Sequence, residues 1–370
     1  MNFEFAPEQL ETQHALRRLF EEGEARRQAR TVLDGKAEYD RALWQRLASL
    51  GYLGAAMPEA LGGAGAGRAT LCILAEEAGR SLAAIPLLSS IYLGAELLHR
   101  AADAATQKHL LPEIMAGRCL LAVAEAAALP VTHGMPRWRA GALDGEVAPV
   151  LDGGSADLLI VEAKDEDVGG TSLILLQSGA PGFAAMPLET IDPSRPQARL
   201  HFAATPGTVL GTPGQARRVL DPVADQAAVL VAFEQIGGAE QALAMARLYA
   251  LERSAFGRQI GSFQAIKHKL VDMYVAITLA RANALYAAWA LEADSDELPH
   301  AAAIARVSAT DAFQLCAREN IQVHGGFGFT WEADCHLFYR RSHLLALTPR
   351  GGRYWRDRAI ATLPLMPEAA

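Results

Sequence analysis

The spacing of apolar residues changes twice along this chain of 370 residues, and that change limits the folds it can adopt. Up to about residue 118, apolar residues recur every three to four positions, as in Leu43, Leu47 and Leu50, which predicts helices. From 119 to 215 the sequence has short runs typical of strands, separated by turn sequences such as LDGG and SGAPG. The helical spacing then returns, most clearly between Ile266 and Leu291.

This order of periods predicts an α+β protein that is mostly α. We expect an N-terminal α-helical domain at 1–118, a small middle β-domain, either a barrel or a sandwich, at 119–215, and a C-terminal four-helix bundle domain at 216–370. Because 51% of the residues are hydrophobic, the chain can bury enough apolar surface for two or three packed domains.

Composition argues against several classes of protein. The net charge of −8 gives no basic footprint for nucleic acid. The N-terminus lacks the basic start and apolar core of a signal peptide, and the stretch 81–95 is shorter than the roughly 20 apolar residues that span a bilayer. We therefore expect a cytoplasmic protein without a membrane segment. The four cysteines are too dispersed for a disulfide framework or a metal site: Cys72, Cys119, Cys316 and Cys335.

The stretch ERSAFGRQIGSFQAIKHKL, residues 252–270, is the first that can carry chemistry. It leaves one helix near Arg253, turns at two glycines and begins the next helix near Phe263. Its arginines and lysines lie close to a helix N-terminus, where backbone N–H groups and a guanidinium suit a phosphate or diphosphate. Taken alone, this is weak evidence, because arginines that flank a turn between helices more often form a solvated face.

The second stretch is IQVHGGFGFTWEADCHLFYRR, residues 321–341. Gly325 and Gly326 let a ligand approach the backbone, and the neighbouring aromatic residues offer ring surface. The plain alternative is a tight turn between helices. The motif is not a Rossmann fingerprint, because the glycine spacing is wrong and a helix, not a strand, precedes it.

Together the two stretches resemble those of the acyl-CoA dehydrogenase family. RSAFGRQIGSFQ is similar to the family's R-x-x-F-G-x-x-I-x-x-F-Q segment, and QVHGGFG to its Q-x-x-G-G-x-G segment. Upstream, LWQRLASLGYLGAAMPEALGGAG and LAEEAGRSL resemble the N-terminal signatures of the same family. The resemblance extends over the whole chain and implies the acyl-CoA dehydrogenase fold, with FAD as cofactor and an acyl-CoA thioester as substrate.

The resemblance also implies which residues hold FAD. The first group, from one chain, is Arg253, Phe256 and Gln264. In it, Arg253 would lie at the diphosphate and Phe256 near the adenine. A second group from a neighbouring chain would complete the site. That second group is Gln322, Gly325 and Gly326. Because no single chain completes such a site, an oligomer is expected.

The catalytic carboxylate of the family is missing from its usual place. Family members remove the α-proton of the thioester with a carboxylate, and the usual glutamate position here is Pro349, with no Asp or Glu between Asp334 and Asp357. An alternative family position corresponds to Ala227. Asp225, two residues away, is a weak candidate whose sequence context favours a helix N-cap. Glu234 is expected to be a buried structural acid with a partner.

The middle segment departs from the family as well. Only Ala124, Glu125 and the run ALPVTHG occupy the place of the flavin-contacting T-E-P-x-x-G-S-D stretch. The nucleotide-binding motifs are intact, whereas the catalytic glutamate and the flavin-contacting stretch are lost. This combination resembles the subunit without the base in heteromeric bacterial enzymes that act on bulky acyl chains such as sterol side chains. A partner subunit would supply the base, and a flavoprotein would accept the electrons.

Three other functions remain open on this fold. They are a homomeric dehydrogenase that uses Asp225, a flavin-dependent oxygenase, and a protein that binds acyl-CoA or a partner without chemistry. The sequence leaves the acyl substrate open; Glu76 and Glu77 are expected to help shape its pocket.

Overall fold

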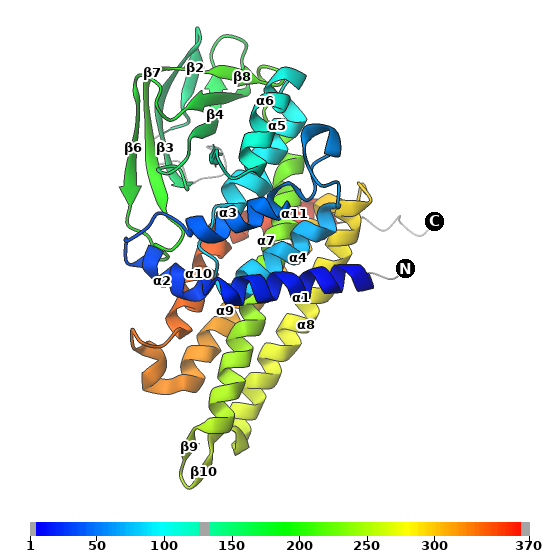
Figure 1. Cartoon of the computed structure of the whole chain (residues 1–370), viewed down its shortest axis with the longest axis vertical. Helices are drawn as coiled ribbons and strands as arrows, with labels where there is room; N and C mark the ends of the chain where they lie inside the picture. The colour runs from blue at the N-terminus through cyan, green and yellow to red at the C-terminus, as the bar shows by residue number, and fades with distance from the viewer. Residues whose placement is uncertain (1–4, 126–133, 364–370) are drawn as a thin grey trace. The chain divides into compact units, whose positions relative to one another are not determined.

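The computed structural model describes residues 5–125 and 134–363. Helices, strands and helices follow one another in the predicted order (Figure 1). The regular elements of the first segment are helices, and the stretch after Pro86, whose side chains are almost all buried, forms a π-helix. Its elements are α1 (Pro7–Glu22), α2 (Ala25–Leu33), α3 (Arg41–Ser49), η1 (Tyr52–Gly54), η2 (Glu59–Leu61), α4 (Arg68–Ser81), η3 (Leu87–Ala95), α5 (Glu96–Ala101) and α6 (Ala104–Met115).

The middle segment forms an eight-stranded sheet in the order β6-β7-β3-β2-β4-β5-β8, with β1 parallel to β4. Six residues in a row at the start of β4 are buried, as expected for a strand inside a sheet with both faces covered. This order is open, so the barrel form of the prediction is not confirmed. The strands are β1 (Leu121–Ala124), β2 (Arg137–Arg139), β3 (Ala142–Leu151), β4 (Leu158–Asp165), β5 (Thr171–Gln177), β6 (Phe183–Leu188), β7 (Gln197–Pro206) and β8 (Thr208–Leu210).

The last segment is again helical, apart from a short hairpin. Helix α9 packs against α8, α10 and α11, which gives the predicted bundle. The elements are α7 (Arg217–Glu252), β9 (Ser254–Ala255), β10 (Arg258–Gln259), η5 (Ile260–Ser262), α8 (Gln264–Glu292), α9 (Leu298–His324), η6 (Gly325–Phe329), α10 (Cys335–Leu347) and α11 (Gly352–Ala361).

The chain forms two compact units, each built from separate stretches of sequence. The first contains α1 up to Phe20, Arg68–Leu82 and the chain from Ala228 onward. The second contains Glu21–Gly67 and Ala83–Ala227. The predicted boundaries near 118 and 215 coincide with changes of secondary structure, and as limits of separate domains they stay a prediction.

Helices α4 and α7 cross within the first unit at a contact that only glycine permits. A Cβ atom at Gly79 would lie 1.8 Å from the carbonyl oxygen of Glu234, and one at Gly237 would lie 1.9 Å from that of Glu76. The two glycines therefore let the helix backbones touch.

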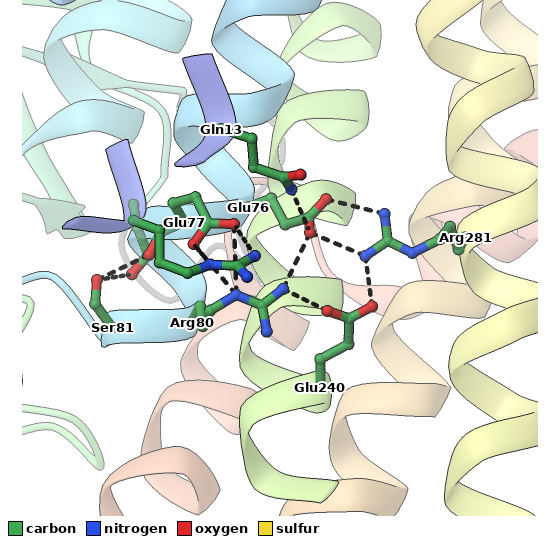
Figure 2. Close-up of polar contacts among 9 residues, drawn as sticks. Gln13, Glu76, Glu77, Arg80, Ser81, Glu240 and Arg281 are labelled. Atoms are coloured by element: carbon green, nitrogen blue, oxygen red, sulfur yellow. Dashed lines mark hydrogen bonds and ion pairs between the residues drawn. The ribbon is translucent and has the colours of Figure 1, made fainter. Parts of the chain in front are cut away.

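A cluster of charged side chains beside this crossing joins α1, α4, α7 and α8 (Figure 2). Glu76 accepts hydrogen bonds from Gln13, Arg80 and Arg281, while Glu77 accepts a bidentate pair from Arg17. The carboxylates of Glu76 and Glu77 are buried against arginines. That these residues help to shape an acyl pocket stays a prediction.

No helix within the described residues combines the length and the apolar character needed to cross a membrane.

Candidate functional site

The sequence that follows α7 forms a tight hairpin (Figure 1). Strands β9 and β10 pair around Phe256 and Gly257, whose φ angles are +53° and +76°. Positive φ at both central residues defines a type I′ turn, the geometry that suits a two-residue hairpin. The turn leaves the Phe256 side chain 95% exposed at the tip.

Arg253 and Gln264 lie at the two ends of this hairpin segment. Both are exposed, and among the described residues no side chain pairs with the Arg253 guanidinium. Gln264 is the first residue of α8, and within the described part of the chain no side chain caps the N-terminus of that helix. The free N–H groups of a helix N-terminus and a nearby guanidinium suit an anion such as a diphosphate.

The second predicted group lies where α9 ends. Gly325 terminates the helix with φ +61°, and Gln322 is exposed one turn earlier. A Cβ atom at Gly325 or Gly326 would meet nothing within 4 Å, so the backbone is open to a ligand there. Gly328 differs, because a Cβ atom would lie 2.7 Å from the carbonyl oxygen of Ile321.

Stacked rings place the two groups at the same end of the first unit. The Tyr249 ring, one turn before Arg253, lies 4.2 Å from the His324 ring and parallel to Phe327 at 6.4 Å, between ring centroids. Within one chain, these ring contacts join the end of α7, just before Arg253, to the end of α9. The prediction that the two groups serve one cofactor from two different chains is not tested by this structure.

The turn Thr348–Gly351, where the family has its catalytic glutamate, is held by two buried side chains. The Arg306 guanidinium donates to the carbonyl oxygens of Leu345 and Thr348 at the end of α10. The Trp355 indole N–H donates to those of Pro349 and Arg350, at 3.1 and 3.0 Å. Both donors bind backbone carbonyl oxygens, so these contacts do not depend on which side chains the turn carries.

A cation, not a carboxylate, occupies this turn. Arg350 is 3% exposed, has φ +51°, and its guanidinium lies 4.6 Å from the centroid of the Tyr354 ring. Burial lowers the pKa of the neighbouring Arg306 to about 9, while the charge of Glu234 acts in the opposite direction. Arg306 therefore remains a cation at neutral pH, stabilised by the C-terminal carbonyls of α10.

The two alternative acids lie in α7. Glu234 is buried 3.6 Å from the equally buried Arg341, so it is the partnered structural acid that the sequence predicts. Asp225 is buried too, but the prediction that it caps a helix N-terminus is wrong. The helix begins at Arg217 and continues through Pro222, which leaves Asp225 in its third turn. As a candidate base, Asp225 stays a prediction.

The start of α7 is fixed by ion pairs that the local sequence pattern does not reveal. Arg217 pairs with Glu162 and Glu125, both at 2.9 Å. The carboxylate of Glu125, one of the few residues left of the family's flavin-contacting stretch, thus has a structural partner. Most of the run ALPVTHG lies outside the described residues.

Sequence reasoning missed Arg306, Trp355 and Tyr249. Arg306 and Tyr249 act through contacts with residues distant in the sequence. Trp355 donates to carbonyl oxygens five and six residues earlier, in a turn that no sequence motif marks. The one available signal is chemical: an arginine inside the apolar stretch HAAAIARVSATDAF needs buried acceptors.

Two family models match the chain. Acyl-CoA dehydrogenase, N-terminal domain, matches residues 6–118, and acyl-CoA dehydrogenase, C-terminal domain, matches residues 217–349. Among curated proteins, acyl-CoA dehydrogenase IpdE2 of Mycobacterium tuberculosis is 35% identical over 315 residues, which cover 85% of this chain and 84% of the relative.

Solved structures of similar proteins include two that are named as pairs of proteins. A variant of the Tcur3481–Tcur3483 steroid ACAD has a TM-score of 0.85 and 30% identity, covering 96% of this chain and 97% of the other. The ChsE4–ChsE5 complex from Mycobacterium tuberculosis has a TM-score of 0.88 and 25% identity, covering 99% and 100%. The predicted fold is confirmed, and the chain belongs to the acyl-CoA dehydrogenase family, whose members are flavoprotein oxidoreductases acting on the CH–CH bond of acyl-CoA thioesters.

Proposed function

We propose that this chain serves FAD-dependent α,β-dehydrogenation of an acyl-CoA thioester as the subunit without the base in a hetero-oligomeric enzyme. The observation that carries the proposal is the turn Thr348–Gly351. Pro349 stands at the usual glutamate position, and the adjacent Arg350 is buried. A prolyl ring cannot accept a proton, and an arginine stays protonated at physiological pH. The usual position thus offers no base, and in this proposal another chain supplies it.

The residues of the first unit fit FAD. Arg253 and the uncapped N-terminus of α8 suit its diphosphate, and the exposed Phe256 ring suits its adenine. The open backbone at Gly325 and Gly326 admits a close approach by the cofactor. When bound, FAD supplies the acceptor for the hydride that leaves the β-carbon of the thioester.

A homologous subunit is the partner that fits this chain. Helix α8 exposes an apolar stripe formed by Val271, Tyr274, Val275 and Leu279. Exposed apolar stripes of this kind mark subunit interfaces. Two of the similar solved structures are named as pairs of proteins, and one of them as a steroid enzyme. We therefore assign a bulky, steroid-type acyl-CoA as substrate class and a flavoprotein as electron acceptor.

The visible absorption spectrum tests this proposal. The chain is purified alone and together with an acyl-CoA dehydrogenase subunit that carries the glutamate, and each sample is titrated with steroid-type acyl-CoA thioesters. We expect flavin absorption that bleaches only in the combined sample. Bleaching of the chain alone would contradict the proposal and favour a homomeric enzyme.

Variants then separate the parts of the proposal. Arg253→Gln should lose flavin absorption from the complex, whereas Arg353→Gln, at an exposed arginine of α11, should retain it. Asp225→Asn should leave turnover of the complex unchanged. Loss of turnover in Asp225→Asn with FAD still bound would instead identify Asp225 as a base.

A further inference from the structure

Three side chains at the β9–β10 hairpin form a continuous stack. The Arg258 guanidinium lies 4.1 Å from the centroid of the Phe263 ring. The Phe263 ring meets the Phe256 ring edge to face, with centroids 6.3 Å apart and planes at 88°. Phe263, which precedes the first residue of α8, thus lies between Arg258 and the ring at the hairpin tip.

Phe256 is a poor choice for its position on stability grounds alone. The φ of +53° places a bulky L-residue in the left-handed region, where Asn or Gly is favoured in a type I′ turn. Its exposed side chain gains almost nothing from burial within the chain. Strain kept at an exposed position points to a function outside the chain.

The stack restricts the ring that the strained turn presents. A Phe side chain free in solvent samples several rotamers, and a ligand that stacks on it must fix one of them. An edge-to-face contact and a cation above the second ring each favour one arrangement. The remaining face of Phe256 is then available to a flat aromatic group.

We propose that Arg258 is a positioning residue, which holds Phe263 and through it orients the exposed Phe256 ring to stack on the adenine of FAD. The inference rests on the proposed function, in which Phe256 lies near the adenine. The inference adds Arg258 as a residue that contacts neither the adenine nor the phosphates of FAD and still determines the affinity for the adenine.

Fluorine NMR tests the orientation without any cofactor. The full chain, in the assembly in which it purifies, carries 4-fluorophenylalanine at position 256. We expect Arg258→Met to narrow and shift the fluorine signal because the ring becomes more mobile, whereas Arg258→Lys keeps most of the original signal. Arg353→Met, at an exposed arginine of α11, is the control and should change nothing. An unchanged signal in Arg258→Met would overturn the proposal.

Titration with adenosine and with ADP separates positioning from direct contact with phosphate. We expect Arg258→Met to weaken both ligands by the same factor, roughly three- to fivefold, and Arg258→Lys to restore most of the affinity. Weakening of ADP alone would make Arg258 a phosphate ligand and overturn the positioning role, as would unchanged affinity for both. Phe256→Leu tests the proposal that the adenine lies at Phe256. If this variant binds adenosine with normal affinity, the adenine does not lie at Phe256, and this conclusion holds whatever the fluorine NMR shows for Arg258.

Discussion

Removing Arg281 tests how much the buried charged cluster stabilises the first unit. In Arg281→Met, the side chain keeps most of its apolar stem and loses the guanidinium that joins Glu76 and Glu240 (Figure 2). The lost contacts are two hydrogen bonds to Glu76, at 3.0 and 2.9 Å, and one to Glu240, at 2.6 Å. Glu76 is 1% exposed and, among the described residues, keeps Gln13 and Arg80 as side-chain donors.

The expected loss of stability is about 3 kcal/mol. Three hydrogen bonds to charged groups, at roughly 1.5–3 kcal/mol each, give a simple sum that is too large. Removing one partner of a buried ion pair costs roughly 3–5 kcal/mol, and we use this range instead. The Arg281 and Glu240 side chains are 28% and 27% exposed, so water replaces part of what is lost and the lower end of that range applies.

Urea denaturation followed by circular dichroism measures this change. Arg118→Met is the matched control, because Arg118 makes a bidentate pair with Glu113 that lies on the surface. We expect no measurable change in the control. A loss below about 1 kcal/mol in Arg281→Met would refute the reasoning, because the cluster would then be no stronger than surface pairs.

The effect of Arg281→Met should depend on pH. Burial opposes ionisation of Glu240, but the charges of Arg281 and Arg80 outweigh it and lower the pKa of Glu240. A carboxylate whose pKa is lower in the folded state stabilises the fold above its unfolded pKa, about 4.5, and this stabilisation is lost as the pH falls through the folded pKa. The difference between wild type and Arg281→Met should therefore shrink below about pH 4.5.

Three further substitutions test other parts of the structure. Gly79→Ala should destabilise the fold by about 3 kcal/mol in urea denaturation, because the added Cβ would overlap the carbonyl oxygen of Glu234. Helix propensity alone predicts the opposite, a gain in stability of about 1 kcal/mol. Gly179→Ala, with open space around it, is the control. Phe256→Asn should raise the free energy of unfolding by roughly 0.5–1 kcal/mol by relieving the strained φ, and at the same time lower FAD affinity; a destabilised variant would contradict the type I′ argument. Arg306→Met should lower the melting temperature by an amount equivalent to about 3 kcal/mol, because the carbonyl oxygens of Leu345 and Thr348 lose their buried donor. An unchanged melting temperature would show that water donates hydrogen bonds to these two oxygens in the variant.

Local patterns in the sequence were sufficient to predict the element types and the turn between two helices where Arg253, Phe256 and Gln264 lie, while the binding of FAD by these residues stays a prediction. Glycine positions, helix spacing and the R-x-x-F-G and Q-x-x-G-G segments report on short stretches of backbone. Arg253, Phe256 and Gln264 therefore lie where the motif places them, around one hairpin. The same local reasoning failed at Asp225, because α7 begins earlier, at Arg217, which pairs with Glu162 in β4 and Glu125 just after β1.

The sequence by itself determined the family, the order of helices and strands, and the absence of a carboxylate between Asp334 and Asp357. Only the tertiary structure decided what replaces that carboxylate: a turn fixed by Arg306 and Trp355, with Arg350 buried. It also decided that Glu76 and Glu77 bind arginines of other helices. The physical reason is that a buried charge takes its partner from whichever segment packs against it, and that segment can be hundreds of residues away in the sequence.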